Sequence, residues 1–345
     1  MIYYYEILYI KCNFIKKFSY CNYFLKSVVW LINISKVKLI SKNKKTTIKS
    51  WSFETVKVDY ECASCMLRQS REAIEHATDN HEKRMEVTLK VLEYMNNNFK
   101  KDINSNKLGT DLHHMIMKET ENNDPYKELR EEGNQIAEKL IPMVKNLFKK
   151  DNSLENFIKI AVAGNIIDFG ALEENTDMES LLKKQITINP AINDTKKLET
   201  DLKNAKNILY LTDNGGEIVF DKLLIKKIKE DYDVNIILAL KENPILNDAL
   251  VSDAKKMNLE KYANIISIGA SSVGVVKDYI SEELKEYMNS VDLIISKGMG
   301  NYEGLTEMYL KTPVYFLLTT KCNVISREIG VPLRSPVILK KFLTD

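Results

Sequence analysis

The strongest constraint on the fold is a strand–helix rhythm that begins near residue 204. Short β-rich runs then alternate with amphipathic stretches to the end of the chain. Alternation of this kind needs crossover connections, which place helices on both faces of a mostly parallel sheet. We therefore expect an α/β domain over residues 201–345. The predicted strands are 208–212, 234–240, 265–268, 293–296 and 314–318, and the predicted helices lie near 216–230, 246–257, 275–288, 302–309 and 321–329.

The segment from residue 56 to residue 200 has the periodicity of helices instead. Apolar residues recur at spacings of three and four, as in Met85, Leu89 and Leu92, and glycine is scarce. The polar stretch 173–200 suggests an exposed crossing between two domains. We therefore predict an all-helical domain over residues 56–200 that packs on the α/β domain.

Residues 1–55 differ from both of these segments. The first fifty residues contain ten lysines, one acidic residue and no glycine or proline. Their uncharged runs fall short of the roughly 20 apolar residues that a membrane-spanning helix needs. The segment is a targeting or membrane segment, a basic arm for a partner, or a stretch outside the natural protein. We favour the last interpretation, because no methionine lies between Met1 and Met66. It predicts a start near Val56 or Val58.

The whole composition is that of a globular protein of ordinary charge. The 345 residues carry a net charge of only +2, which argues against a general nucleic-acid binder. Five cysteines do not make a disulfide framework, and they fit a reducing cytoplasm. We expect a cytoplasmic protein without a membrane partner.

The end of the first predicted strand carries the clearest candidate site. The strand is followed by Asp213, Asn214, Gly215 and Gly216. In open α/β sheets, ligands bind at the carboxyl ends of the strands. Asp and Asn offer the oxygen ligands that Mg²⁺ or Mn²⁺ prefers. The glycines let the backbone approach a ligand, and the next helix points its amides at an anion such as phosphate. The same residues are also typical of a capped turn.

Two further strand ends carry polar side chains. Asn247 and Asp248 follow the second strand, and Lys297 follows the fourth. Asp248 can supply a third oxygen ligand, and Lys297 can place a positive charge on a phosphoryl oxygen. Each has an ordinary alternative, namely a helix cap or a surface lysine. Their coincidence at one sheet edge nevertheless predicts a site for a divalent cation and a phosphate group.

Two motifs in the helical half remain open. Asn165 and Asp168 share a helix face inside an apolar stretch, so they either reach a functional site or form a structural hydrogen-bond pair. Cys62 and Cys65 lie three residues apart at the start of a helix. They form part of an accessory metal site or are packing residues without a metal, because a structural zinc site normally needs four ligands.

Together these motifs resemble the damage-control phosphatases, a family long known as domain of unknown function 89. The likeness runs from about residue 57 to the C-terminus, and the Cys62-x-x-Cys65 pattern looks like the archaeal and bacterial branch. The motifs that carry it are Asp213-Asn214-Gly215-Gly216-Glu217, Asn247-Asp248, the segment from Lys297 through Asn301 to Glu303, the segment 163–168 that holds Asn165 and Asp168, and the segment 124–127.

The resemblance implies a helical domain packed on a Rossmann-like domain, with the active site between them. It further implies a phosphatase that uses a divalent metal (Mn, Co, Ni or Mg) and acts on small phosphorylated metabolites. Carried over by position, Asp213, Asn214 and Asp248 would hold the metal, Lys297 would bind phosphate, Asn165 and Asp168 would reach the cleft, and Glu217 and Glu303 would line it.

Two other classes of function stay open on the sequence. A Rossmann-type carboxyl methyltransferase would show a glycine-rich first loop and an acid that ends the second strand. A non-catalytic protein that binds a metal or metabolite would show no turnover. The sequence does not assign the general acid of a phosphatase reaction. Asp168 and Glu217 are the candidates.

Overall fold

The computed structural model describes residues 56–164 and 177–344. All of these residues belong to one compact unit, Phe53–Asp345. Asn165 and Asp168 lie outside the described residues, as does the segment 1–55, so the predictions made for them stay predictions. Within the described part of the chain, no helix is both long enough and apolar enough to cross a bilayer.

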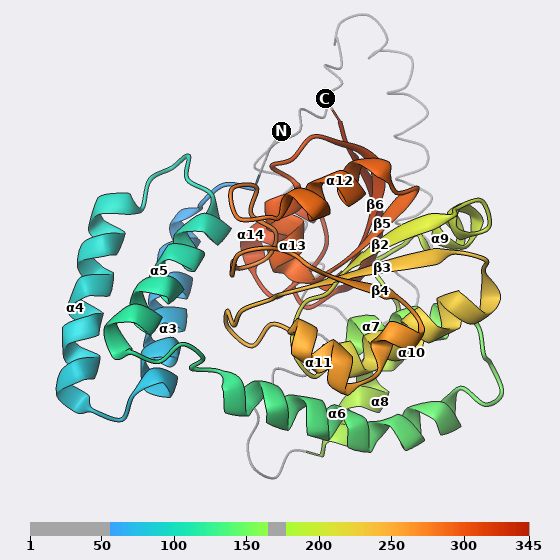
Figure 1. Cartoon of the computed structure of the whole chain (residues 1–345), viewed down its shortest axis with the longest axis horizontal. Coiled ribbons are helices and arrows are strands. Elements are labelled where there is room, and N and C mark those ends of the chain that lie inside the picture. Colours follow the sequence, from blue (N-terminus) through green and yellow to red (C-terminus); the bar gives the residue numbers. More distant parts are fainter. Residues whose placement is uncertain (1–55, 165–176, 345) are drawn as a thin grey trace, which may run out of the picture. The chain divides into compact units, whose positions relative to one another are not determined.

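Three N-terminal helices share a core of their own. They are α3 (Tyr60–Ala77), α4 (His81–Asn98) and α5 (Ser105–Thr120) (Figure 1). Each begins at a side-chain cap that accepts a backbone N–H, supplied by Asp59, Asn80 and Asn104 respectively. Their apolar stripes meet in a cluster of Met66, Ala73, Ile74, Val87, Val91, Leu108, Leu112 and Ile116.

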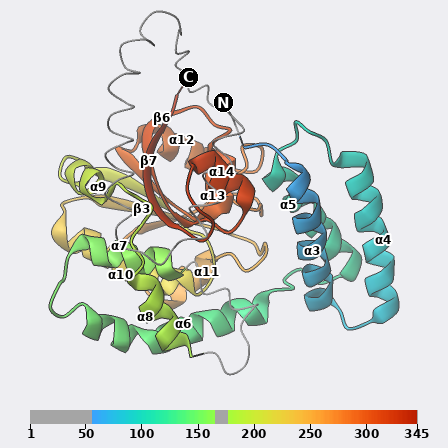
Figure 2. The same ribbon diagram turned by 180° about the vertical axis from the view of Figure 1, so that it is seen from behind.

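Four more helices join the core of the sheet rather than that of α3–α5. They are α6 (Lys127–Leu147), α7 (Leu154–Gly164), α8 (Met178–Ile186) and α9 (Thr195–Leu202) (Figure 2). The expected exposed crossing over residues 173–200 is helical in most of its described part and mostly exposed, but it also contributes buried residues to the core of the sheet. Leu182 of α8 and Leu198 of α9 are fully buried, because both helices turn an apolar side toward the sheet.

Within residues 56–164 and 177–344, the sheet has seven strands in the order β1-β7-β6-β5-β2-β3-β4. Every neighbouring pair is parallel except β6 and β7, which are antiparallel. This mixed α/β architecture with a mostly parallel sheet confirms the expected fold class. The strands are β1 (Ile192–Asn193), β2 (Asn207–Leu211), β3 (Asn235–Leu240), β4 (Asn264–Ser267), β5 (Leu293–Lys297), β6 (Leu310–Thr319) and β7 (Pro336–Leu343).

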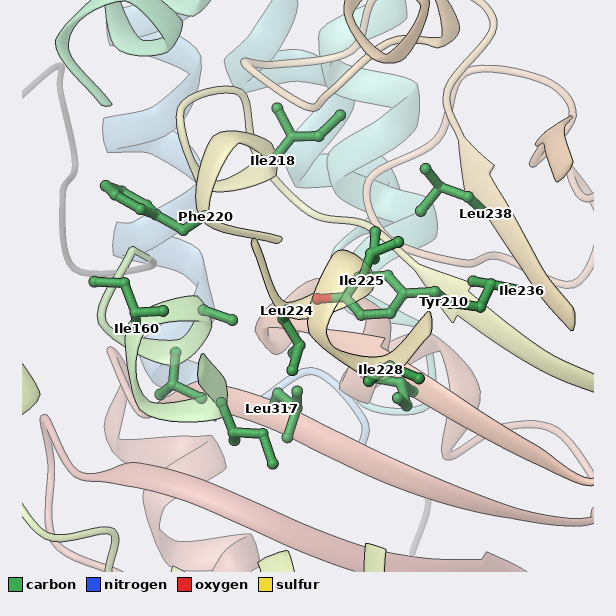
Figure 3. Close-up of a cluster of buried hydrophobic side chains, with 14 of the residues drawn as sticks. Ile160, Tyr210, Ile218, Phe220, Leu224, Ile225, Ile228, Ile236, Leu238 and Leu317 are labelled. Carbon is green, nitrogen blue, oxygen red and sulfur yellow. The ribbon is translucent and has the colours of Figure 1, made fainter. Parts of the chain in front are cut away.

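Both faces of the sheet are buried, as a parallel sheet requires. Alternate residues of each strand enter opposite clusters, so Tyr210 and Leu238 face one side while Leu209 and Ile237 face the other. Figure 3 shows the first cluster, where Tyr210 and Leu238 meet apolar side chains of α10 (Glu217–Asp231). The second cluster lies under α12 (Glu282–Ser290), α13 (Gly298–Leu305) and α14 (Asn323–Ile329).

Two of the predicted helices are shorter than expected. The helix predicted at 246–257 begins only with α11 (Val251–Lys256), because the chain at Leu246 turns through a left-handed φ of 47°. The helix predicted at 275–288 begins only at Glu282, where the side chain of Ser281 caps α12. Strands β1 and β7 were not predicted.

Candidate active site

A cavity of about 370 Å³ opens at the carboxyl end of β2. It is bounded by α3 and α5 on one side and by the loops after β2 and β3, α13 and the start of α14 on the other. The polar and sulfur-bearing residues that line it include Asp213, Asn214, Asp248, Glu303, Lys321, Asn106, Glu61, Cys62, Cys65 and Cys322.

Backbone hydrogen bonds hold Asp213 and Asp248 next to one another. The loops after β2 and β3 form an antiparallel bridge between Asn214 and Asp248. On either side of it, the amide of Gly215 donates to the carbonyl of Asn247 at 2.7 Å, and the amide of Ala249 donates to the carbonyl of Asp213 at 2.8 Å. The structure thus brings the three predicted metal ligands together at the cavity wall.

Burial dominates the electrostatics of these two acids. It raises the pKa of Asp213 well above the usual value, and the charges of Glu217 and Asp248 raise it further, while Lys297 and Lys321 oppose this. Burial also raises the pKa of Asp248 to about 7, against the opposing charge of Lys241. A cation placed between the two carboxylates would offset this cost.

Lys241 is a site residue that sequence analysis missed. Its side chain is 2% exposed, and its Nζ lies 3.8 Å from Asp248 Oδ2 and donates to the carbonyl of Gly274 at 2.6 Å. A charged residue at the end of an otherwise apolar strand was the available signal. Lys241 therefore balances part of the charge of Asp248 from inside the protein.

Lys297 is not where the phosphate role would place it. The side chain is fully buried and does not line the cavity. Its Nζ donates to Glu217 Oε2 at 2.9 Å and to Asp221 Oδ1 at 2.8 Å. It neutralises these two acids beneath the Asp213 loop. Two lysines line the cavity, Lys57 and Lys321. Lys57 is paired with Glu307, whereas the charge of Lys321 acts on Asp213.

The two glycines of the loop also have a different role from the one expected. The amide of Gly215 is bonded to the carbonyl of Asn247, and the amide of Gly216 donates to Asn134 Oδ1 at 2.6 Å. Neither amide is therefore free for a phosphate group. Gly216 is needed for its φ of 77°, and a Cβ on Gly215 would lie 2.5 Å from Arg130 Cγ.

Glu217 and Asn301, two further predicted residues, hold the loop after β2 in place through hydrogen bonds. Glu217 is buried and accepts from Asn214 Nδ2 at 3.0 Å, which leaves the amide oxygen of Asn214 as the atom suited to a cation. Asn301 Nδ2 donates to the carbonyls of Thr212 and Lys297, both at 2.8 Å, and so ties α13 to the end of β2. Neither Glu217 nor Asn301 lines the cavity.

Glu303 lines the cavity from the α13 side. Its Oε2 accepts a hydrogen bond from Ser105 Oγ of α5. Burial raises the pKa of this carboxyl to about 7, although the Ser105 bond opposes the shift. Glu303 is therefore partly protonated near neutral pH, which is the state that a general acid needs.

Preformed metal clusters are absent from the described ranges, 56–164 and 177–344. No three His, Cys, Asp or Glu side chains there are arranged to hold an ion. An accessory metal on Cys62 and Cys65 gains no support from this. A cation at Asp213 and Asp248 would rely on the Asn214 amide oxygen and on ligands from outside the protein.

Comparison with known proteins places the chain in a family. Residues 58–337 match the model described as damage-control phosphatase ARMT1-like domain. The match covers most of the chain, so the chain belongs to this family. The resemblance drawn from the strand-end motifs is thereby confirmed.

Particular relatives extend over the same region. A damage-control phosphatase of Pyrococcus horikoshii is 35% identical over 285 residues, which cover 83% of this chain and 98% of the relative. A protein of Methanocaldococcus jannaschii is 38% identical over 295 residues, covering 84% and 97%. The crystal structure of a DUF89 family protein from Pyrococcus horikoshii matches with a TM-score of 0.77 and 35% identity, and it covers 82% of this chain and 99% of its own.

Proposed function

We propose that this protein is a divalent-metal-dependent phosphatase that hydrolyses phosphate monoesters of small metabolites. The observation that carries the proposal is the bridge that sets Asp213, Asn214 and Asp248 side by side on a cavity wall. Membership of the family supports the same reaction, and relatives in two archaea bear the name damage-control phosphatase.

The donor set fits a hard divalent cation. Two carboxylates and one amide oxygen are the ligands that Mg²⁺ or Mn²⁺ takes, and such ions usually keep further positions for water and substrate phosphate. Asp213, Asn214 and Asp248 would hold the ion. When bound, it would supply charge stabilisation at the phosphoryl oxygens and a water of lowered pKa.

The other groups of the cavity supply what hydrolysis of a monoester still needs. Lys321 presents the cation that would bind phosphoryl oxygens, in the role expected of Lys297. Glu303 would donate a proton to the leaving alkoxide, because its carboxyl retains a proton near neutral pH. Lys241 and Lys297 would hold the acids of the loop in place.

The cavity favours a small, hydroxyl-rich substrate such as a sugar phosphate. Its volume of about 370 Å³ suits a single metabolite. Gln69, Asn106 and Asn323 line it and offer amide groups to hydroxyl groups. Asn106 and Asn323 offer chiefly their carbonyl oxygens, because their Nδ2 atoms donate to Gly300 and Glu61. A carboxyl methyltransferase is less compatible with the loop after β2, because that loop presents carboxylates and its glycine amides are occupied.

A phosphatase assay with and without added metal tests the proposal. The chelated protein should not hydrolyse p-nitrophenyl phosphate, and Mn²⁺ or Mg²⁺ should restore turnover. Asp248→Asn should lose at least about a hundredfold in kcat/KM, since a ligand is weakened and its charge removed. The matched control is Asp233→Asn, an exposed aspartate just before the amino end of β3, which should keep wild-type turnover. Equal activity in the two variants would refute the site.

A further inference from the structure

Three thiols line the cavity, two from α3 and one from the start of α14. Cys62 and Cys65 belong to the first turns of α3, and Cys322 is the N-cap residue of α14. All three line the cavity, all three are half-buried, and none is in a disulfide. Phosphate hydrolysis as proposed above uses none of them.

Side-chain contacts hold Cys62 and Cys322 at one corner of the cavity wall. Glu61 and Asn323 are their immediate neighbours in the sequence, and Asn323 Nδ2 donates to Glu61 Oε2 at 2.9 Å. Arg327 Nη1 donates to the other oxygen of Glu61 at 2.6 Å, which ties α3 to α14 a second time. The charge of Glu303 acts on both thiols, and the charge of Cys62 acts on Cys322.

Contacts between the two segments favour this pair over Cys62 and Cys65. Glu61 and Asn323, the sequence neighbours of Cys62 and Cys322, are hydrogen-bonded to each other. Cys65 Sγ instead accepts a hydrogen bond from Arg68 of its own helix at 3.8 Å. Cys322 has extended backbone (φ −132°, ψ 155°) outside any helix, so it can adjust without breaking hydrogen bonds of a helix interior.

We propose that Cys62 and Cys322 form a thiol-modification site that closes reversibly into a disulfide across the cavity wall. The oxidant is a small aliphatic disulfide, RSSR. One cysteine thiolate attacks RSSR to form a mixed disulfide and releases RS⁻. The second thiol gives its proton to RS⁻ and attacks the cysteine sulfur of the mixed disulfide, which releases a second RS⁻. Two electrons pass from the cysteines to RSSR, which leaves as two thiols.

The pKa values of the two thiols determine the rate of disulfide formation. Burial raises the pKa of Cys322 to about 11 and also raises that of Cys62. Few thiolates are present at pH 7, so closure should accelerate as the pH rises toward 9. The charged carboxyl of Glu303 opposes thiolate formation at both sulfurs. The charges of Asp59 and Cys65 also raise the pKa of Cys62.

Closure would act on the site through Lys321, the residue before Cys322. A disulfide would fix this segment against α3 and restrict the side chain of Lys321. Phosphatase turnover should then fall by at least about tenfold and return when the disulfide is reduced. This last consequence rests on the proposed function, whereas formation of the disulfide does not.

The test is peptide mapping of the full chain after treatment with bis(2-hydroxyethyl) disulfide. We expect a Cys62–Cys322 cross-linked peptide that dithiothreitol removes, that persists in Cys65→Ser and that is absent in Cys322→Ser. A Cys62–Cys65 link, or hydroxyethyl adducts alone, would overturn the proposal.

Turnover of p-nitrophenyl phosphate is measured on the same samples. A reduced protein without phosphatase activity that still forms the cross-link would refute the proposed function and leave the thiol site standing. A cross-link with unchanged turnover would refute the regulatory consequence.

Discussion

At the scale of single residues, the site depends on buried charges that the surrounding chain keeps in balance. Lys297 is buried against Glu217 and Asp221, and burial raises the pKa of Asp221 to about 6 despite the lysine. Lys241 balances Asp248 in the same way. Sequence analysis identified Lys297 at a strand end but missed Lys241. The partners of the two lysines could not be predicted, because they come from a helix face and a returning loop that only the folded chain brings near.

Lys297→Met should destabilise the fold rather than only impair substrate binding. The substitution leaves two acids buried without their cation, which typically costs about 3–5 kcal/mol. The free energy of unfolding in urea measures this cost. The control is Lys226→Met, whose partner Glu230 is exposed and whose loss should cost less than about 1 kcal/mol. Equal small effects in both variants would contradict the structural role of Lys297.

Glu303 should set the alkaline limb of the activity profile. Its pKa of about 7, raised by burial, means that the protonated acid is lost as the pH rises through neutrality. With a sugar phosphate as substrate, whose alkoxide leaving group needs a proton, turnover at saturating metal should therefore decline above pH 7 as this proton is lost. The facing titratable groups, Cys62 and Cys322, ionise at higher pH, because burial raises their pKa values as well. Glu303→Gln should lower kcat by about 10²–10⁴-fold and remove that limb. An unchanged limb in this variant would exclude Glu303 as the acid.

The same raised pKa has a consequence for stability. The carboxyl of Glu303 binds its proton more tightly when folded than at its usual value of 4.5. Its contribution to stability is therefore present at low pH and is lost as the pH rises from about 4.5 to about 7. Glu303→Gln should flatten the pH dependence of the unfolding free energy over this window. A slope as steep as that of the wild type would contradict the burial of the carboxyl.

At the scale of elements, periodicity predicted most strands because each is a buried apolar run. It failed at β7, a lysine-containing strand that pairs antiparallel to β6 instead of continuing the alternation. It also failed at 246–250, where polar residues and apolar residues look like a helix start. That segment instead returns to pair with the loop after β2, a long-range contact with no local signal, and it is this contact that positions Asp248.

The link between α5 and α13 should matter for both stability and turnover. Asn106 of α5 is 3% exposed, and its Nδ2 donates to the carbonyl of Gly300 at 2.6 Å. Asn106→Leu removes the donor and leaves the carbonyl without this partner, at a cost of about 1–3 kcal/mol. Because α13 carries Glu303, kcat should fall as well. Chemical denaturation measures the free energy of unfolding and a phosphatase assay measures kcat. The control is Asn146→Leu, at an exposed position. Equal unfolding free energies and equal kcat values in the two variants would count against this link.

At the scale of the whole molecule, the cavity lies where α3 and α5 meet the carboxyl edge of the sheet. Contacts across this boundary include Ser105 with Glu303, Asn106 with Gly300 and Glu61 with Arg327. Sequence analysis predicted strands β2 to β6 and the acids that follow β2 and β3, but it did not predict β1 at Ile192–Asn193, which lies before residue 201. It could not predict which residues of α3 and α5 line the cavity. No spacing in the sequence relates the residues of these two helices to the strand ends of the sheet.

A divalent cation should stabilise the folded chain by binding it preferentially. Ligand at a hundred times its Kd contributes about 2.7 kcal/mol, which raises the unfolding temperature by a few degrees. Thermal unfolding with increasing Mn²⁺ should show this rise in the wild type and in Asp233→Asn. It should be absent in Asp248→Asn. A similar rise in Asp248→Asn would mean that the ion binds elsewhere.

The measurement that tests the account most directly is a titration of Mn²⁺ binding and phosphatase turnover on the same Asp213→Asn and wild-type samples. We expect one Mn²⁺ per wild-type chain, with turnover that rises in proportion to the occupancy of the site. Asp213→Asn should lose both Mn²⁺ binding and turnover. Its far-ultraviolet circular dichroism should stay that of the wild type. Stoichiometric binding or undiminished turnover in the folded Asp213→Asn protein would contradict the assignment of the loops after β2 and β3 as the catalytic metal site.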